Sequence, residues 1–483
     1  MLVRMAHNGV LDGIEPCPVA VFLHIRERVR KKKKIFILGL ESFRGRAIAQ
    51  TSLMLTCVMP VVLLRRHPPP HLISHRSMRS KNCFKAGIYF SHYECFGHTS
   101  RVMAVGEVFK KRFPQGNLFF IQAGVRQPKA QIGQLGKVYS LPGILADRRH
   151  FREPIGGAGA DTGERSKVCE DIVSSQRPDL FMTELFPLGR EECRHELIPS
   201  LVKASGQGAI IWGVAGYPLI TGTNHEWREQ ILKTYQQIII FSPSLEKEHI
   251  ADSFTRKQDR QRYLDFFERH AQKIIFAGYL LPQQEVVRDD EDKNLPKPPI
   301  GKGACRVAVF RGGGAYFPKV IAQAIRASDL LGEEYYLTVV AGPSTTAQEW
   351  YFFSTLVGKK KVNNLVLLRA VGNYEGLVKQ SDVCVSVAGY HTSVMLLKHH
   401  KKAVVIPFEG YGSMSFLEQP ARAILLKEMI GAKIVSIDDL TANTLAAVIK
   451  EAAASGEVST PIPKDWFMGG DVLDRSLTGL FGR

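Results

Sequence analysis

A histidine follows a glycine in the stretch HYECFGHTSR, residues 92–101, where an apolar run gives way to a helical pattern. Gly97 would let the backbone approach a ligand closely, because it has no side chain. His98 would stand at the start of the helix, where its imidazole could act as a general base on a hydroxyl group. The alternative is a capping or loop histidine without chemistry, which is the more common role for a histidine judged on position alone.

A second stretch, VCVSVAGYHTSVMLLK at residues 383–398, has the pattern of a buried strand, a tight turn and a helix. Small and hydroxylated residues, Ala388 to Thr392, occupy the turn. Helix N-termini expose unpaired N–H groups and a partial positive charge, so they bind phosphates well. The pattern therefore predicts an anion site, and most simply a phosphate site, at the start of this helix.

Three weaker signals accompany these two. RGGG, residues 311–314, follows a strand of the same half and is either a plain glycine-rich turn or a backbone cradle for a phosphate or a sugar. Glu418 and Gln419 could accept hydrogen bonds from sugar hydroxyls, or could simply begin a helix. Glu184, in TELFPLGREE, could be a catalytic carboxylate, although a solvated loop acid is the better interpretation on spacing alone.

The elements that must position these residues alternate between apolar strands and helical segments. In the first half, buried strands are predicted at residues 84–92, 117–124, 178–185, 208–216, 236–243 and 273–280. In the second half, they are predicted at residues 305–310, 335–343, 364–371, 383–389, 403–408 and 432–437. The alternation predicts two α/β units with parallel sheets, each covered by helices on both faces.

The predicted organisation has five parts. Residues 1–80 form a basic leader, 83–281 a first Rossmann-like domain, 282–303 a charged and proline-rich linker, 304–455 a second Rossmann-like domain, and 456–483 a C-terminal segment. The net charge of +18 lies mainly in the leader. Its apolar stretch, residues 47–64, leaves three interpretations open: a poorly ordered extension, a basic membrane-surface anchor, or a spanning helix.

The sequence lacks the signals of several other classes of protein. Its eight cysteines form no CxxC pair, which favours a reduced, cytoplasmic protein over a disulfide scaffold or a zinc site. We find no GxxxxGK[ST], HExxH or GxSxG motif, so no metal site is expected. The lysine run at residues 31–34 has no aromatic or glycine-rich RNA-binding pattern beside it, so no nucleic-acid partner is expected.

Several of these motifs together resemble a known family. FGHTSR, RPDLFMTELFPLGR, FRGGG, VAGPS, VCVSVAGYHT and LEQPARA, between residues 84 and 450, resemble predicted bacterial glycosyltransferases of the GT-B fold. These are relatives of the N-acetylglucosaminyltransferase that completes lipid II, with a glycosyltransferase family 28 C-terminal domain. The resemblance implies two Rossmann-like domains facing a cleft, a nucleotide-sugar donor (UDP-linked by preference), no other cofactor and no metal. It also implies a glycan, lipid-linked or small-molecule acceptor. The cysteine pattern favours the cytoplasm, and the membrane-surface interpretation of the leader would add peripheral contact with the inner membrane.

The resemblance also implies roles for individual residues. His98 and Glu184 would be catalytic, and the acceptor would lie near Phe96, Gly97 and Arg101. The residues implied to bind the donor are Gly312, Gly313, Gly314, Ser386, Gly389, Tyr390, His391, Thr392, Glu418 and Gln419.

The sequence departs from the family at one position. The helix after the diphosphate turn usually carries a glutamate for the donor ribose, and Met395 stands at the equivalent place. A thioether is a weak acceptor. Met395 therefore favours one alternative to an inverting sugar transfer, a degenerate protein that binds nucleotide sugars without catalysis. A second alternative, a UDP-sugar 2-epimerase, shares the same two-domain plan.

Overall fold

The computed structural model describes residues 83–92, 97–124, 132–142, 146–147, 150–151, 162–220, 226–282, 303–312, 317–342, 345–360, 363–408, 410–411, 414–415, 417–456 and 460–480. The chain divides into two units, Met1–Ser74 and His75–Arg483. Every described residue belongs to the second unit. The predicted leader lies outside the described residues, as does nearly all of the predicted linker. No helix in the described ranges is long and apolar enough to cross a membrane.

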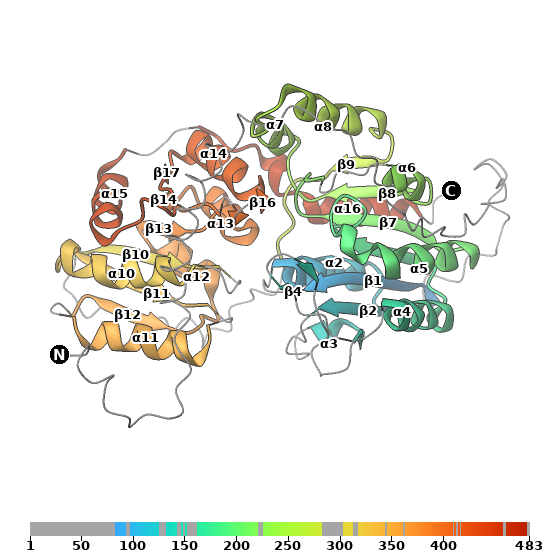
Figure 1. The fold of residues 1–483 in the computed structure, drawn as a ribbon, viewed down its shortest axis with the longest axis horizontal. Helices are drawn as coiled ribbons and strands as arrows, with labels where there is room; N and C mark the ends of the chain where they lie inside the picture. Colours follow the sequence, from blue (N-terminus) through green and yellow to red (C-terminus); the bar gives the residue numbers. More distant parts are fainter. Residues whose placement is uncertain are drawn as a thin grey trace, which may run out of the picture. The chain divides into compact units, whose positions relative to one another are not determined.

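The first half of the second unit is built on a seven-stranded parallel sheet with the order β3-β2-β1-β6-β7-β8-β9. Its strands are β1 (Lys85–His92), β2 (Asn117–Gly124), β3 (Lys137–Ser140), β6 (Leu180–Glu184), β7 (Ile210–Ala215), β8 (Gln237–Ile240) and β9 (Ile274–Phe276). Its helices are α2 (Gly97–Arg112), α3 (Ile132–Leu135), α4 (Thr162–Gln176), α5 (Arg194–Gly206), α6 (Glu226–Leu232), α7 (Leu245–Asp252) and α8 (Lys257–Arg269). Figure 1 shows these elements in blue to yellow-green.

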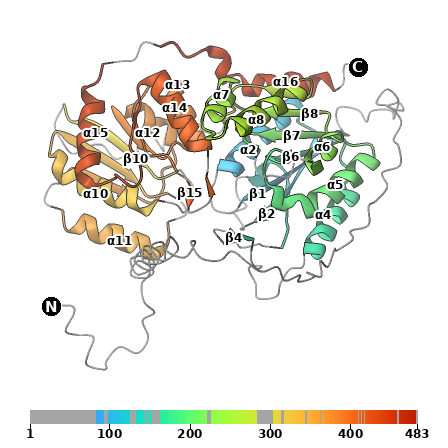
Figure 2. The same cartoon turned by 45° about the horizontal axis from the view of Figure 1, so that its top comes forward.

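The second half contains a six-stranded parallel sheet with the order β12-β11-β10-β13-β14-β17. Its strands are β10 (Cys305–Phe310), β11 (Tyr335–Val340), β12 (Leu365–Leu368), β13 (Val383–Ser386), β14 (Lys402–Val405) and β17 (Lys433–Ile434). Its helices are α10 (Pro318–Leu331), α11 (Ala347–Gly358), α12 (Tyr374–Gln380), α13 (Tyr390–Lys398), α14 (Glu418–Ile430) and α15 (Ala442–Ala454). Helices cover both faces of each sheet (Figures 1 and 2).

The predicted strands are all present, although several are shorter than their apolar runs suggested. β3 was not predicted, and neither were two short antiparallel pairs, β4 (Ala146–Asp147) with β5 (His150–Phe151) and β15 (Gly410–Tyr411) with β16 (Met414–Ser415). The predicted two-domain α/β architecture is therefore confirmed. In each sheet the strand order reverses once, between β1 and β6 and between β10 and β13. Ligands of open α/β sheets bind outside the carboxyl ends of strands at such reversals. The turns that follow these four strands are therefore where a site is expected.

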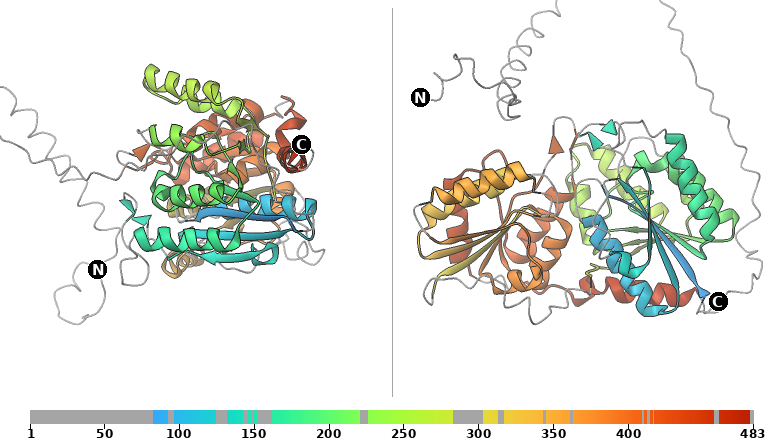
Figure 3. Two further views of the ribbon diagram at one scale, coloured as in Figure 1. Left: turned by 90° about the vertical axis from the view of Figure 1, so that its right-hand side faces the viewer. Right: turned by 90° about the horizontal axis from the view of Figure 1, so that it is seen from below.

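The C-terminal segment returns to the first half of the unit. After a short 3₁₀ turn at Lys464–Phe467, α16 (Gly469–Gly479) packs along α2, as the right-hand view of Figure 3 shows. Gly278 makes this return possible, because its φ is +76° and a β-carbon there would collide with the carbonyls of Asp465 and Trp466. One apolar cluster runs through both halves and includes Tyr279, Tyr390 and Trp466. The sequence predicted the helix but not its place on the first half.

Candidate active site

The β1–α2 junction and the end of β6 bring His98 and Glu184 together. His98 lies in the first turn of α2, and its Nδ1 is 2.9 Å from both carboxylate oxygens of Glu184. Glu184 is the last residue of β6, the neighbour of β1 at the strand-order reversal, and its side chain is fully buried. The two predicted catalytic residues are therefore hydrogen-bonded to one another, and Glu184 is not a solvated loop acid.

Arg101 completes this buried group. It lies one turn further along α2 and donates to Glu184 Oε1 through its guanidinium. Gly216, after β7, leaves room for it, since a β-carbon there would collide with the guanidinium. Burial alone would raise the pKa of Glu184, but His98, Arg101 and Arg190 outweigh it and hold the pKa below its ordinary value. Glu184 is thus a carboxylate, and the neighbouring arginines balance its buried charge.

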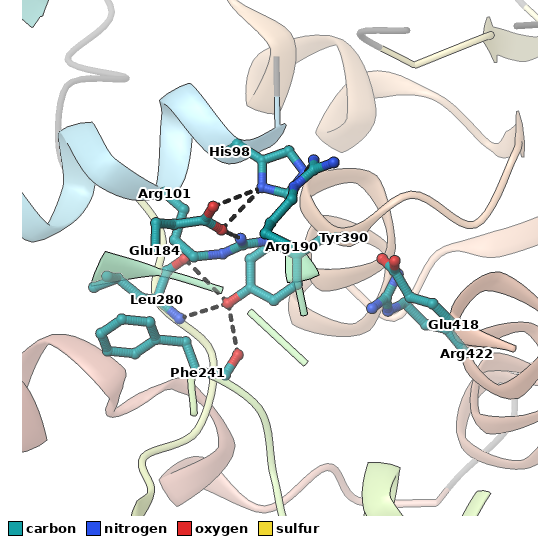
Figure 4. A network of polar contacts seen from close by, with 9 residues as sticks. All are labelled: His98, Arg101, Glu184, Arg190, Phe241, Leu280, Tyr390, Glu418 and Arg422. Carbon is teal, nitrogen blue, oxygen red and sulfur yellow. Dashed lines mark hydrogen bonds and ion pairs between the residues drawn. The ribbon is translucent and has the colours of Figure 1, made fainter. Parts of the chain in front are cut away.

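A fourth residue, Arg190, fixes the proton of the imidazole. Its Nη2 lies 2.8 Å from His98 Nε2 (Figure 4). A guanidinium can only donate and a carboxylate can only accept. Nδ1 must therefore carry the proton that it donates to Glu184, while Nε2 presents its lone pair to Arg190. In this hydrogen-bond arrangement a carboxylate orients the imidazole through Nδ1 and leaves Nε2 as the acceptor, which is the arrangement a general base requires.

The β13–α13 junction has the features of an anion site. Gly389 is the N-cap of α13 and has extended backbone angles, and no side chain caps the helix. A β-carbon at Gly389 would meet nothing within 4 Å, so its α-carbon faces open space. The first turn of α13 carries no acidic residue. The backbone N–H groups at the start of this helix are therefore available to an anion.

Two serines of β13 and α13, and the turn that follows β10, lie near the carboxyl ends of these neighbouring strands. The hydroxyl oxygens of Ser386, at the end of β13, and of Ser393, in α13, are buried without a hydrogen-bond partner among the described residues. At the end of neighbouring β10, Gly312 has a φ of +80°, and its carbonyl lies so near Gly342 that a β-carbon there would be only 2.7 Å away. Buried hydroxyls normally find partners, which makes these two candidate ligand contacts.

Tyr390 ties the start of α13 to the first half of the unit. Its hydroxyl donates to the carbonyl oxygen of Phe241 at 2.7 Å and accepts from the backbone N–H of Leu280 at 3.1 Å. The Arg101 guanidinium lies 4.9 Å from the centre of its ring (Figure 4). The side chain of Tyr390 therefore joins the predicted donor site to the His98–Glu184 group, and its hydroxyl is occupied by backbone contacts.

Arg422 braces the same turn from α14. Its Nη1 donates to the carbonyl oxygen of Ala388 at 3.1 Å and to Glu418 Oε1 at 3.0 Å. Its Nε lies 3.5 Å from Glu246 Oε1 across the two halves. Ala388 has a φ of +51°, an unusual conformation for a residue with a side chain, so this hydrogen bond helps to hold the turn.

A small cavity joins the two junctions. It is lined by Gly97, Ser100 and Arg101 of α2, by Tyr390 and His391 of α13, and by residues 280–282. The first turns of two helices from different sheets therefore face the same space. No group of three or more His, Cys, Asp and Glu residues in the described ranges could hold a metal ion.

A family model matches the second half of the unit. Residues 307–464 match the model of the glycosyltransferase family 28 C-terminal domain. The second half is therefore similar to this domain over the matched residues. The match covers most of β10, the β13–α13 turn and α14. A search of curated protein sequences finds no match.

Solved structures match both halves. The calicheamicin glycosyltransferase CalG4 covers 82% of this chain and 94% of its own, with 11% identity and a TM-score of 0.50. SnogD from Streptomyces nogalater covers 82% and 99%, with 12% identity and a TM-score of 0.50. UDP-GlcNAc 2-epimerase from Neisseria meningitidis, solved with UDP-GlcNAc, covers 82% and 100%, with 11% identity and a TM-score of 0.50. The fold is GT-B, as predicted, and it is shared by transferases and an epimerase.

Other predicted donor residues of the second half already have hydrogen-bond or ring contacts within the protein. Thr392 Oγ1 is hydrogen-bonded to the hydroxyl of Tyr374 at 2.6 Å, and Gln419 Oε1 accepts from the N–H of Phe408 at 2.9 Å. His391 packs edge-on against Tyr374 at 5.5 Å. Met395 is buried in the apolar core. Phe96, Gly313 and Gly314 lie outside the described residues.

Sequence reasoning assigned no role to Arg190, Arg422 or Glu246. Arg190 and Arg422 lie within the quoted motifs TELFPLGR and LEQPARA. A signal was present for Arg422, because an arginine flanked by Ala421 and Ala423 on an apolar helix face needs a partner when it is buried. Arg190 has no such local signal, since its partner His98 lies 92 residues away.

Proposed function

We propose that the protein transfers a sugar from a nucleoside-diphosphate sugar to a hydroxyl group of an acceptor. The observation that carries the proposal is that the first turn of α2 and the uncapped first turn of α13 line one small cavity. The His98–Glu184 pair lies beside it, since His98 belongs to the same turn of α2 as Gly97 and Arg101, which line the cavity. The first turn of α2 supplies a base, and the first turn of α13 supplies an anion site. The family 28 match over residues 307–464 supports the same assignment.

On the donor side, the diphosphate binds at the N-terminus of α13. Its oxygens accept from the backbone N–H groups after Gly389 and from the hydroxyls of Ser386 and Ser393. Gly312 lets the turn after β10 approach from the neighbouring strand. The donor is UDP-linked by preference, and neither a metal nor another cofactor is required, because the helix N-terminus stabilises the leaving diphosphate.

On the acceptor side, His98 Nε2 removes the proton of the acceptor hydroxyl, and Glu184 stabilises the imidazolium that results. The hydroxyl oxygen forms the new bond to C1 of the sugar. The bond between C1 and the diphosphate oxygen breaks, and its electron pair leaves with the nucleoside diphosphate. Attack from the face opposite the diphosphate inverts the anomeric centre. We place this reaction in the cytoplasm, at a lipid-linked or cell-surface glycan precursor.

The proposal is tested by the nucleoside diphosphate released from UDP-, GDP- and ADP-sugars, with and without a mixture of glycan, lipid-linked and small-molecule acceptors. Release that needs an acceptor and is lost in His98→Gln supports transfer. Conversion of a UDP-sugar to its 2-epimer without an acceptor would contradict it. Binding without any turnover would identify a degenerate binding protein, as Met395 allows.

A further inference from the structure

Arg190 is hydrogen-bonded to the nitrogen of His98 that would act as the base. Its guanidinium donates to His98 Nε2 at 2.8 Å, the lone pair that the proposed mechanism uses to accept the acceptor's proton. A lone pair engaged by a guanidinium is unavailable to a hydroxyl. The arrangement in Figure 4 is therefore a resting one, and Arg190 must leave His98 before the base can act.

The loop that carries Arg190 is held at its backbone, so the movement belongs to the side chain. The N–H of Gly189 donates to the carbonyl of Leu185 at 2.8 Å, and Arg228 Nε donates to the carbonyl of Pro187 at 2.8 Å. Arg190 itself has a φ of +58°, in the left-handed region. Its side chain is 20% exposed, whereas that of Glu184 is fully buried. Arg190 is thus the outermost member of the group.

For Arg190 to leave His98, it needs a better partner than the imidazole. Its ion pair with Glu192 is long, at 3.5 Å. Glu184 already has a direct ion pair with Arg101. The first turn of α2 carries no acidic residue, so it too favours an anion. A guanidinium can form two parallel hydrogen bonds and a full ion pair with a phosphate or a carboxylate, whereas one imidazole nitrogen offers it a single acceptor. An anionic group would therefore draw Arg190 away from His98.

We propose that Arg190 recognises an anionic group of the acceptor, a phosphate or a carboxylate, and that this contact makes His98 Nε2 available to the acceptor hydroxyl. The proposal rests on the proposed function and deepens it, because it names the chemical class of the acceptor. Arg190 is then a specificity-determining residue. With an acceptor that lacks the anionic group, Arg190 stays hydrogen-bonded to His98 Nε2 and the base cannot act.

Histidine side-chain ¹⁵N NMR of the full chain tests the exchange directly. The signals of His98 are assigned by their loss in His98→Gln, and inorganic phosphate is the probe, added to protein saturated with UDP so that the α13 site is filled. Phosphate is expected to shift the Nε2 signal saturably in the wild type. Arg190→Gln should weaken this response at least tenfold, whereas Arg190→Lys should keep part of it.

Two controls separate this proposal from the proposed function. Glu192→Gln should keep the phosphate response, since it removes only the neighbouring acid. Gly389→Asp should also keep it without UDP, because the α13 site is not involved. No shift of His98 Nε2 in the wild type, or an equal response in folded Arg190→Gln, would overturn the role of Arg190. Failure of UDP binding with an intact phosphate response would instead count against the donor site.

Discussion

The two junctions of this protein prepare for chemistry in opposite ways. At the β1–α2 junction, the side chains of His98, Glu184 and Arg101 form a buried group that is complete before any ligand arrives. At the β13–α13 junction, the main feature is backbone: an uncapped helix start with open space at Gly389. A base needs a fixed orientation, which side chains supply, whereas a diphosphate needs several N–H donors, which a helix start supplies.

Because one junction is built from buried side chains and the other from backbone, substitutions at the two should have different effects. A change at the first junction disturbs a buried charge network, so it should affect both stability and reaction rate. A change at Gly389 meets no neighbouring atom, so it should affect ligand binding alone. Tyr390 belongs to both junctions and should show a mixture of the two effects.

The largest expected effect is on the reaction rate. His98→Gln keeps a polar side chain near Glu184 but removes the base. We expect the rate of acceptor-dependent nucleoside diphosphate release to fall by about 10²- to 10⁴-fold, with UDP affinity unchanged within about twofold. The measurement is product release at saturating donor. A variant that retains the full rate would exclude His98 as the base.

Next in size is the stability of the first junction. Arg101→Met leaves Glu184 buried with less compensation, and we expect the free energy of unfolding to fall by about 3–5 kcal/mol. Urea denaturation measures the loss. The double variant Arg101→Met with Glu184→Gln should recover part of it, because the uncompensated charge is gone. An unchanged unfolding midpoint in Arg101→Met would show that the ion pair with Glu184 does not contribute to the free energy of unfolding.

The second junction should respond through binding alone. Gly389→Asp places a carboxylate beside the proposed diphosphate, and we expect UDP affinity to fall on the order of 100-fold without loss of stability. Gly389→Ala is the matched control, since its backbone angles suit alanine and nothing lies within 4 Å. It should bind UDP nearly as well as the wild type. Equal affinity of the aspartate variant would place the diphosphate elsewhere.

Most elements of the two junctions could be predicted from the sequence, because they depend on local sequence patterns. The strands, both strand-to-helix turns, and His98, Glu184 and Arg101 as candidates followed from apolar runs, small residues and the family resemblance. The side-chain partners did not follow. Tyr390 was expected at the diphosphate, yet its hydroxyl bonds backbone groups 110 and 149 residues away. Such contacts depend on how the two halves pack, which no local period encodes.

Tyr390→Phe tests the link between the junctions. It removes the hydroxyl and leaves the Leu280 N–H and the Phe241 carbonyl without this partner, so we expect a loss of about 1–3 kcal/mol in the free energy of unfolding. UDP affinity should weaken only a few-fold, because the backbone of α13 remains. Urea denaturation and UDP titration of the same preparation measure both. No change in stability would show that the Leu280 N–H and the Phe241 carbonyl find other partners in the variant.

The smallest expected effect is at Glu375, a carboxylate of α12 that pairs with Lys398 and His399 at the C-terminal end of α13. Burial raises the pKa of Glu375, but Lys398, Lys379 and His399 outweigh it and lower the pKa to about 2. A lowered folded pKa stabilises the protein above the ordinary value of 4.5, and the contribution is lost as the pH falls toward about 2. Glu375→Gln should therefore be slightly less stable than the wild type at pH 7, with a difference that shrinks below pH 4.5. Urea midpoints across this range measure it, and a constant difference would contradict the lowered pKa.

The central claim, that the β13–α13 junction holds a nucleoside diphosphate, is tested most directly by calorimetric titration of the full chain with UDP, GDP and ADP. We predict saturable binding of one nucleotide, with UDP the tightest, in the wild type and in Gly389→Ala, and a large loss in Gly389→Asp. No binding of any of the three to a folded sample, or binding that is indifferent to Gly389→Asp, would contradict the account.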